Sequence, residues 1–560
     1  MIMNRAERRR QEKLIKKQKE GRTEGATDQK AIDWFQKALI CQQNSQWEEA
    51  IQLYRKALSA NRNFIEAYNN LGNLLRNIGK PEEAKLIFEK ALKTDPENST
   101  IKSNLATVLQ LQGHVDKAIH LLKEVIGNDP NHTDALNNLG LLYYSKSRFE
   151  EAKEVFEKIL ERDRDNTDAL NNLGTILHYE GNSEKAEKLF KQIIDKIPEH
   201  FNARNNLGEL YADTGKIDGA INCYKDALKI NPKFTRSKRN LGFSYLWKQD
   251  LDNALHYLKE SAEEQHNNLY QVKKGFLSKT RIKHDYDQLN HLLNKKLIDK
   301  KYTKTIEQLA QLKDSNEDPV TVPEEVEDLC QKIIFLPEEK NIGKIINPDL
   351  DVNKIQKDFR KHEPAEYVVI DNLLTKEAML EIRRFCNEST IWKTEYGPGY
   401  LGAFMGEGFA SKFIMRFSEE LKTTFKGIFG DRLLQQAWAF KCDNSQSGVK
   451  IHADFAAVNV NFWLSPESAN LDTKTGGLIV WDKPSPPDWH FQDYNTNEEK
   501  IRSYLQDQKA SFIRVPFKEN RVLIFNSTLF HETDQIKFKE GYENRRTNMT
   551  LLYGRDLRKN

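Results

Sequence analysis

A repeating period of 34 residues constrains this chain more than any other feature of its sequence. Alanine returns at every period from Ala50 to Ala254, and a large apolar residue recurs four positions after each alanine. Glycine or alanine keeps the same step from Gly72 to Gly242. Proline closes several units, because a residue without a backbone N–H ends a helix. The pattern predicts stacked pairs of helices, with small residues where two helices approach closely.

This pattern resembles the tetratricopeptide repeat, whose helix pairs stack into a right-handed superhelix. The resemblance covers residues 31–264 in seven units. Residues 1–30 carry ten Lys or Arg and five Asp or Glu. That balance favours a solvated, disordered tail over a contact with nucleic acid or an anionic membrane. Residues 265–364 keep helical spacing and then gain acids and prolines, so we expect a helical cap followed by a linker.

An asparagine stands before the leucine of six repeats. Asparagine is a mediocre helix former, so helix propensity does not explain the series. The series resembles the asparagine ladder of O-linked N-acetylglucosamine transferase, whose repeats hold an extended peptide by its main chain. The resemblance implies a groove that binds a protein or peptide, while a structural role as ties between helices stays open. The six residues are Asn70, Asn104, Asn138, Asn172, Asn206 and Asn240.

The character of the chain changes after residue 365. The segment 365–386 reads as a short strand, a turn and an amphipathic helix. Short apolar runs such as VNVNFWL, GGLIVW and RVLIFNS then alternate with turn residues. Many short strands with this punctuation are typical of a sandwich or jelly-roll. We expect a multidomain protein, in which an all-α repeat superhelix precedes an α+β or all-β jelly-roll domain, the double-stranded β-helix.

A metal site is predicted within these strands. His452 and Asp454 are separated by one residue where a strand begins, and alternate residues of a strand share a face. His531 stands at the end of another predicted strand. Two histidines and a carboxylate on one face of an ion form the facial triad of non-haem Fe(II) oxygenases. Two other His-x-Asp pairs, at His114 and His132, fall inside the helical repeats without a partner histidine on a strand.

The last predicted strand adds a candidate anion site. Arg546, Asn548 and Thr550 share one side of this strand. The guanidinium of an arginine there could bind a carboxylate bidentately. A His-x-Asp pair, a distal His and then Arg-x-Asn resemble the Fe(II)/2-oxoglutarate-dependent oxygenases. The segment after residue 365 is similar to the entry of their prolyl-hydroxylase-like branch. The resemblance covers residues 365–556.

The resemblance implies a role for each of these residues. His452, Asp454 and His531 would bind Fe(II), 2-oxoglutarate would chelate it, and O2 would be the second substrate. Arg546 would pair with the far carboxylate of 2-oxoglutarate. Arg545 points to the opposite side and is the alternative if the strand register slips. Prolyl 4-hydroxylases usually place a lysine at the position of Arg546, so the resemblance leaves the substrate open.

Two further features have alternative interpretations. Asn459 and Asn461 follow the metal motif on one strand face, where they contact the co-substrate or substrate, or only complete the barrel. The glycine- and aromatic-rich segment 395–409 is a lid over the iron or a plain connecting loop.

Composition narrows the function classes. Lys plus Arg (86) nearly balances Asp plus Glu (83), which predicts no specific nucleic-acid partner. No apolar run approaches the roughly 20 residues that cross a bilayer, and five scattered cysteines indicate reduced thiols in the cytoplasm. We therefore expect a cytoplasmic 2-oxoglutarate-dependent dioxygenase that hydroxylates a protein or peptide recruited by the repeats. The alternatives are an oxygenase for a small molecule with the repeats as a docking module, and a repeat scaffold without catalysis.

Overall fold

The structure, a computed structural model, describes residues 26–44, 46–271, 275–361, 365–397, 399–443, 448–489 and 491–555. The predicted basic tail, residues 1–30, lies almost entirely outside these ranges. The chain divides into two compact units, Met1–Tyr179 and Glu180–Asn560. Among the helices of the described ranges, none is both long and apolar enough to cross a membrane.

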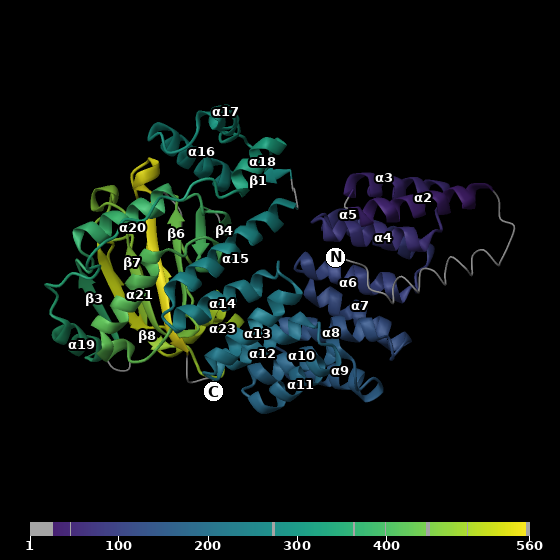
Figure 1. Ribbon diagram of the computed structural model, residues 1–560, viewed down its shortest axis with the longest axis horizontal. Helices are drawn as coiled ribbons and strands as arrows, with labels where there is room; N and C mark the ends of the chain where they lie inside the picture. The colour runs from purple at the N-terminus through teal and green to yellow at the C-terminus, as the bar shows by residue number, and fades with distance from the viewer. Residues whose placement is uncertain are drawn as a thin grey trace. The chain divides into compact units, whose positions relative to one another are not determined.

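Helix pairs make up the first unit, and each helix lies beside the next in the chain (Figure 1). The pairs begin with α2 (Ala26–Gln43), α3 (Trp47–Ala60), α4 (Ile65–Asn77), α5 (Pro81–Thr94) and α6 (Ser99–Leu111). They continue with α7 (Val115–Asn128), α8 (Thr133–Ser145), α9 (Phe149–Arg162) and α10 (Thr167–Tyr179). The second unit opens with helices of the same kind, namely α11 (Ser183–Lys196), α12 (Phe201–Asp213), α13 (Ile217–Ile230), α14 (Thr235–Trp247) and α15 (Leu251–Gln271).

The periodic residues explain how these helices pack. Every alanine of the 34-residue series, from Ala50 to Ala254, is fully buried. A Cβ placed on Gly72 would lie 2.5 Å from the ring of Phe88, and one on Gly208 would lie 2.6 Å from the ring of Tyr224. Because such distances are sterically forbidden, the small residue is required where the aromatic ring of the second helix crosses the first.

The segment after the repeats is folded rather than extended. It contains β1 (Phe276–Leu277), α16 (Lys279–Asn294), η1 (Lys300–Tyr302), α17 (Thr303–Leu312), β2 (Val320–Thr321) and α18 (Glu324–Gln331). Strand β2 lies within the part expected to be a linker, where it pairs with β1. Ile282, Leu309 and Val326 share a small core under these elements. Residues 276–331 fold because they contain apolar side chains that are buried among the acids and prolines.

A mixed α/β domain with antiparallel sheets forms the C-terminal part. Its helices are α19 (Val352–Arg360), α20 (Lys376–Glu388), η2 (Met405–Glu407), α21 (Lys412–Thr424), α22 (Lys426–Phe429), η3 (Glu467–Ala469), α23 (Phe491–Asn495), α24 (Glu498–Asp507) and η4 (Tyr542–Asn544). Its strands are β3 (Tyr367–Asp371), β4 (Thr394–Gly397), β5 (Tyr400–Phe404), β6 (Leu434–Cys442), β7 (Ala456–Trp463), β8 (Leu478–Pro484), β9 (Phe512–Val515), β10 (Arg521–Asn526), β11 (Leu529–Thr533) and β12 (Arg546–Arg555). The large sheet has the order β3-β10-β7-β12-β6-β5-β4, and a second sheet has the order β11-β8-β9. The glycine-rich segment 395–409 forms much of the β4–β5 hairpin and η2.

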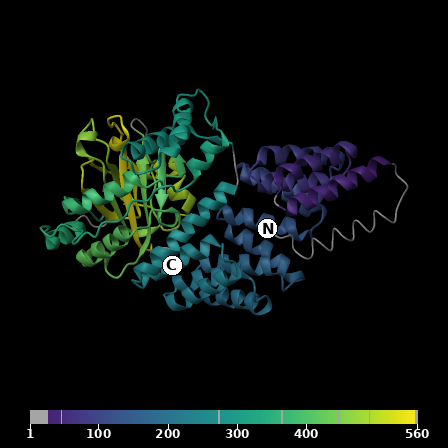
Figure 2. The same ribbon diagram turned by 45° about the horizontal axis from the view of Figure 1, so that its top comes forward.

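The two faces of the large sheet differ in chemistry. Val458, Val460 and Phe462 of β7 point into a core shared with α20 and α21, which lie on one face of this sheet (Figures 1 and 2). The alternate residues of β7, Asn459 and Asn461, lie on the opposite face. That face carries the site described below.

The last repeat helices of the second unit share a core with the C-terminal domain. Phe243, Leu246 and Leu258 of α14 and α15 belong to the same apolar cluster as the sheet residues of β7. The indole N–H of Trp247 donates to the carbonyl of Leu434 at 2.7 Å. Helix α15 also packs against η2. Within this unit, the repeats and the sheet domain are therefore one packed body.

Candidate metal centre

Backbone pairing brings the two predicted histidine ligands together. His452 and His531 form an isolated antiparallel bridge, in which the N–H of each donates to the carbonyl of the other at 3.0 and 2.8 Å. Directly paired residues project to the same face of a sheet. Their rings consequently lie side by side, with centroids 4.3 Å apart. This pairing joins two residues that are 79 positions apart in the sequence.

The imidazoles are held in the tautomer that a metal requires. Nδ1 of His452 lies 2.7 Å from the carbonyl of Lys450, and Nδ1 of His531 lies 3.1 Å from the carbonyl of Leu529. A carbonyl oxygen only accepts, so each Nδ1 carries the proton and each Nε2 presents a lone pair.

Asp454 completes the triad. Its Oδ1 is 3.9 Å from Nε2 of His452, and its Oδ2 is 3.5 Å from Nε2 of His531. The three ligand atoms lie within 4.8 Å of one another. Burial raises the pKa of Asp454, and burial lowers the pKa of His531 well below its usual range. A desolvated carboxylate beside two imidazole lone pairs fits a divalent cation, because the cation compensates the buried charge.

The two asparagines after the metal motif have different surroundings. The amide of Asn459 is fully buried and donates to Oδ2 of Asp454 at 2.6 Å, so it orients a ligand. The amide of Asn461 donates to the hydroxyl of Thr550 at 3.1 Å and lines the pocket. Its Oδ1 is buried without a hydrogen-bond partner among the described residues.

One open pocket contains the triad and the predicted anion site. The pocket is lined by Trp438, Phe440, Val449, His452, Asp454, Asn461, Leu478, His531, Thr533, Arg546, Asn548 and Thr550. The structure therefore brings together the three triad residues, Arg546, Asn461, Asn548 and Thr550, as the strand pattern predicts. Sequence reasoning missed Trp438, Phe440, Val449, Leu478 and Thr533, because apolar and hydroxyl residues of this kind do not signal which of the two faces of a sheet carries a site.

Arg546 is a buried cation with neutral partners. Only 1% of its surface is exposed, and its guanidinium donates to the carbonyl of Gly476 at 2.6 Å and to Oδ1 of Asn548 at 2.9 Å. The carboxylate that acts on it, Asp534, is itself paired with Arg514 at 3.3 Å. Burial lowers the pKa of Arg546, yet a guanidinium stays protonated in proteins. Such a group favours an anionic ligand.

Arg545 points away from the pocket. Its guanidinium contacts the carboxylate of Asp287 on α16 at 2.7 Å, and only 4% of its surface is exposed. Strand alternation thus separates the two arginines as expected, and Arg545 is committed to an ion pair on the opposite face.

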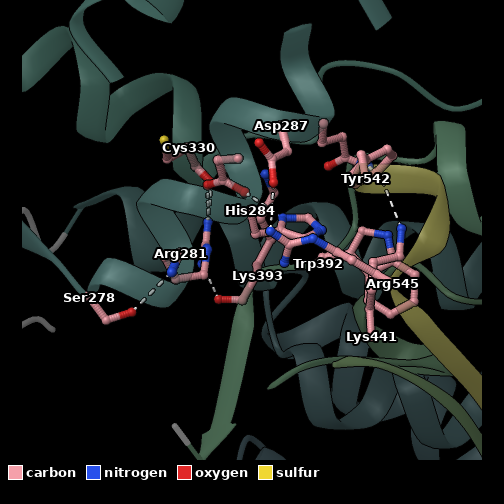
Figure 3. A network of polar contacts seen from close by, with 12 residues as sticks. Ser278, Arg281, His284, Asp287, Cys330, Trp392, Lys393, Lys441, Tyr542 and Arg545 are labelled. Atoms are coloured by element: carbon pink, nitrogen blue, oxygen red, sulfur yellow. Dashed lines mark hydrogen bonds and ion pairs between the residues drawn. The ribbon is translucent and has the colours of Figure 1, made fainter. Parts of the chain in front are cut away.

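A second polar cluster surrounds this ion pair (Figure 3). The ammonium of Lys441 donates to the carbonyl of Cys386 at 2.9 Å and to the hydroxyl of Tyr542 at 2.8 Å. It also lies 4.6 Å from the ring centroid of Trp392. Gln288 of α16 donates to the same hydroxyl at 2.9 Å. Burial lowers the pKa of Lys441 to about 7.

Helix α16 contributes further charged groups to this cluster. Arg281 contacts Asp285 at 2.8 Å and the carbonyl of Cys330 at 2.7 Å, and it also donates to the carbonyl of Lys393. His284 lies 3.1 Å from Asp285 and is fully buried. Burial lowers the pKa of His284 to about 3. The segment between repeats and sheet is therefore anchored to the strand that carries Arg546.

Three of the six ladder asparagines contact the first helix of the preceding repeat. In the first unit, Asn104 donates to Asn69 at 2.6 Å. Asn172 in the first unit and Asn240 in the second donate to the asparagine at the corresponding earlier position, at 3.1 and 3.4 Å. These ties are the structural role that the sequence left open. Asn206 is 7% exposed, and Asn70, Asn104, Asn138, Asn172 and Asn240 are half-buried.

Comparison with known proteins identifies the helical part. Models of the tetratricopeptide repeat match residues 38–79, 78–137, 109–177 and 165–233. The N-terminal part of the chain is thus a tetratricopeptide-repeat array, and a β-rich domain with a His-Asp-His triad follows it. No curated protein matches the chain.

Several solved structures overlap with part of the chain. A tetratricopeptide repeat protein from Parabacteroides merdae is 22% identical over 43% of this chain and 96% of its own, with a TM-score of 0.38. YrrB, a TPR protein with an unusual peptide-binding site, is 22% identical over 33% of this chain and 95% of its own, with a TM-score of 0.26. Yeast Tom70 is 18% identical over 44% of this chain and 53% of its own, with a TM-score of 0.36.

Proposed function

We propose that the C-terminal domain is an Fe(II)- and 2-oxoglutarate-dependent dioxygenase that hydroxylates a protein or peptide recruited by the repeats. The main support for this proposal is that one pocket holds two imidazoles, one carboxylate and a buried arginine with neutral partners. Two antiparallel sheets support a double-stranded β-helix, and His452, which lies four residues before β7 of the large sheet, pairs with His531 on β11 of the other sheet.

The proposed site residues would act as follows. Nε2 of His452, Nε2 of His531 and a carboxylate oxygen of Asp454 would hold Fe(II), which when bound supplies O2 activation coupled to the oxidation of 2-oxoglutarate. The amide of Asn459 fixes one oxygen of Asp454. The overall reaction converts 2-oxoglutarate, O2 and a substrate C–H into succinate, CO2 and a C–OH group, which balances every atom.

Arg546 is the proposed partner of the far carboxylate of 2-oxoglutarate. Its present acceptors are carbonyl and amide oxygens, so a carboxylate would gain a charge-assisted, bidentate pair. Asn461 and Thr550 lie on neighbouring strands in direct register and add polar groups to the same pocket. The buried position of Arg546 excludes water from that pair, which strengthens it.

We propose that the repeat asparagines also contribute amide groups to peptide binding. Tetratricopeptide repeats generally serve protein–protein interaction, and the ladder positions keep part of their surface accessible. An amide has two donors and an acceptor, so a tie to one neighbour leaves capacity for a backbone group.

Metal loading of the full chain tests this function. His452→Ala and His531→Ala should each abolish stoichiometric Fe(II), measured by elemental analysis, because a third of the ligand set is lost. His114→Ala is the matched control, since it alters a His-x-Asp pair in the repeats and should retain iron. Arg546→Ala should keep iron but raise the 2-oxoglutarate KM for succinate release strongly, as a desolvated charge pair is worth on the order of 2–5 kcal/mol.

Two results would contradict the proposed function. Full iron content in a variant that lacks all three triad side chains would exclude the metal assignment. An unchanged 2-oxoglutarate dependence in Arg546→Ala would exclude the anion site while leaving the metal centre intact.

A further inference from the structure

The pocket face of the large sheet carries a cluster of aromatic rings that the proposed reaction does not use. We define this aromatic wall as the side chains of Tyr396, Tyr400, Phe404, Trp438 and Phe440, from strands β4, β5 and β6. Two of them, Trp438 and Phe440, line the pocket directly. Each of the five rings keeps part of its surface exposed, and Tyr396 is 39% exposed.

Strand register connects this wall to the metal pocket. In one row across the sheet, Phe404 pairs with Trp438, Trp438 with Thr550, and Thr550 with Asn461. Paired residues of antiparallel strands project to the same face. The row therefore begins with two aromatic rings and ends with two polar groups of the proposed co-substrate site.

The rings form one continuous surface. Phe404 and Trp438 have centroids 5.3 Å apart, and Tyr396 lies 5.3 Å from Phe404 and 5.4 Å from Phe440. Gly402 makes this arrangement possible, because a Cβ there would lie 2.6 Å from the ring of Tyr396 and 2.7 Å from that of Phe440. The alternate residues of β5, Leu401 and Ala403, face the core on the other side of the sheet, and among the five rings Tyr400 packs against a second apolar cluster.

The far end of the wall meets the last repeat. Phe404 leads directly into η2, where a Cβ on Gly406 would lie 2.8 Å from the side chain of Arg239 on α14. Arg239 is exposed and adjacent to the ladder residue Asn240. Gln265 of α15 donates to the carboxylate of Glu407 at 3.3 Å. The wall thus spans the distance between the metal pocket and a repeat helix within one compact unit.

The chemistry of the wall restricts what can lie on it. None of its five side chains is charged, so the wall offers no counter-ion to a phosphate or a free carboxylate, and its only polar groups are two phenol hydroxyls and one indole N–H. Apolar and ring-bearing groups gain most from contact with partly exposed aromatic faces. From β6 to β4 the wall is about 10 Å wide, which matches about three residues of an extended chain.

We infer that the aromatic wall is the specificity surface of the site, and that its substrate is an extended polypeptide with an apolar or ring-bearing side chain within about three residues of the hydroxylated position. This inference rests on the proposed function. It assigns Phe404 and Tyr396 to substrate selection, away from the metal and the co-substrate. A small polar substrate would make no use of these rings.

Randomised short peptides test the inference on the full chain with Fe(II) and 2-oxoglutarate. Peptides that gain the mass of one oxygen atom should be enriched for an apolar side chain at a fixed offset from the modified residue. Phe404→Ser should lower the yield of these products about tenfold, as expected for the loss of an aromatic anchor. Phe404→Leu should restore most of the yield, since it remains apolar.

Controls separate this inference from the proposed function. Phe512→Ser removes a more exposed aromatic ring, on β9 and outside the pocket, and should leave the product yield unchanged. Iron content and peptide-independent succinate release, measured on the same samples, report on the proposed function alone. Three results overturn the inference when the wild-type protein holds iron and releases succinate. They are that no peptide is oxidised, that the oxidised peptides show no apolar preference, or that Phe404→Ser gives the same product yield as Phe512→Ser. If wild-type protein holds no iron and forms no succinate, the proposed function itself fails.

Discussion

At the scale of single residues, the site depends on groups that orient other groups. The carbonyls of Lys450 and Leu529 fix the tautomers of the two histidines, and Asn459 fixes the carboxylate of Asp454. Such partners of ligands usually change metal affinity when they are removed.

Asn459 offers a direct test of this dependence. Asn459→Ala should weaken Fe(II) binding about 10- to 100-fold, because Asp454 loses the donor that holds Oδ2. Metal titration of the full chain measures the affinity. The matched control is Asn461→Ala on the same strand face, which contacts no triad residue and should keep wild-type iron affinity. Equal iron affinities in the two variants would show that the contact with Asp454 is dispensable.

The buried His284 predicts a dependence of stability on pH. Its pKa is lowered to about 3 in the folded chain, so below pH 6.5 the unfolded chain binds a proton that the folded chain does not. The stability contributed by this group is fully present above pH 6.5 and is lost progressively toward pH 3. At pH 4.5 the loss is about 2–3 kcal/mol.

Comparison with His284→Phe isolates this effect from other titrating groups. The phenyl ring preserves the edge contacts with Trp392 and Tyr542 but cannot bind a proton. Denaturant unfolding at pH 7 and at pH 4.5 should show a smaller loss of stability in the variant. A loss as large as that of the wild type would mean that His284 does not stay neutral in the folded protein.

At the scale of elements, helix α16 emerges as part of the site's support. Its residues Gln288 and Asp287 contact Tyr542 and Arg545, which immediately precede β12. Arg546, the first residue of β12, points into the pocket on the other face. The backbone that places Arg546 is therefore held from behind by a helix that comes before the sheet domain in the sequence.

Asp287→Asn should reveal this support. The neutral amide leaves the buried Arg545 without its counter-ion, so the start of β12 becomes less fixed. The 2-oxoglutarate KM for succinate release should rise about three- to tenfold, while iron content stays at the wild-type level. Lys283→Gln changes another residue of α16 and breaks the ion pair of Lys283 with Asp443, which follows β6, so it should change neither quantity. A rise in KM that is equal in both variants would point to general destabilisation of α16.

At the scale of the whole molecule, the last repeats and the sheet domain fold as one unit. Phe243, Leu246 and Leu258 are buried in the same core as the sheet residues, and Trp247 bonds to β6. Burial of each such side chain contributes about 1.5–3 kcal/mol. Removal of α14 and α15 would expose their apolar partners on η2 and α21.

Two fragments test this prediction. Residues 180–560 should be monomeric in size-exclusion chromatography and should retain Fe(II). Residues 365–560 should aggregate, because they lack the partners that cover their helical face. A soluble 365–560 fragment with the same melting temperature as 180–560 would show that the shared core contributes little.

Much of this architecture can be predicted from local sequence patterns. The 34-residue period predicts the repeats, because each helix pair contacts mainly its neighbours. Alternation along single strands separates Arg546 from Arg545 and groups Arg546 with Asn548 and Thr550. In these cases the relevant geometry lies within one element or between adjacent ones. The His-x-Asp spacing also points to two metal ligands, but His452 and Asp454 lie before β7, which begins at Ala456, so alternation along a strand does not align them.

Tertiary structure alone decided the rest. Strand order in the large sheet does not follow the sequence, so the pairing that sets Trp438 beside Thr550 and Phe404 beside Trp438 has no local signature. The contact of Asp287 with Arg545 joins residues 258 positions apart. Whether Asn459 orients a ligand or enters the pocket depended on the path of the chain between Asp454 and β7. The sequence by itself determined the repeats, because these follow from local periodicity, and it supplied the residue types of the triad. The walls and supports of the pocket were fixed only by long-range packing, because residues far apart in the chain acquire neighbours only when the sheets close on each other.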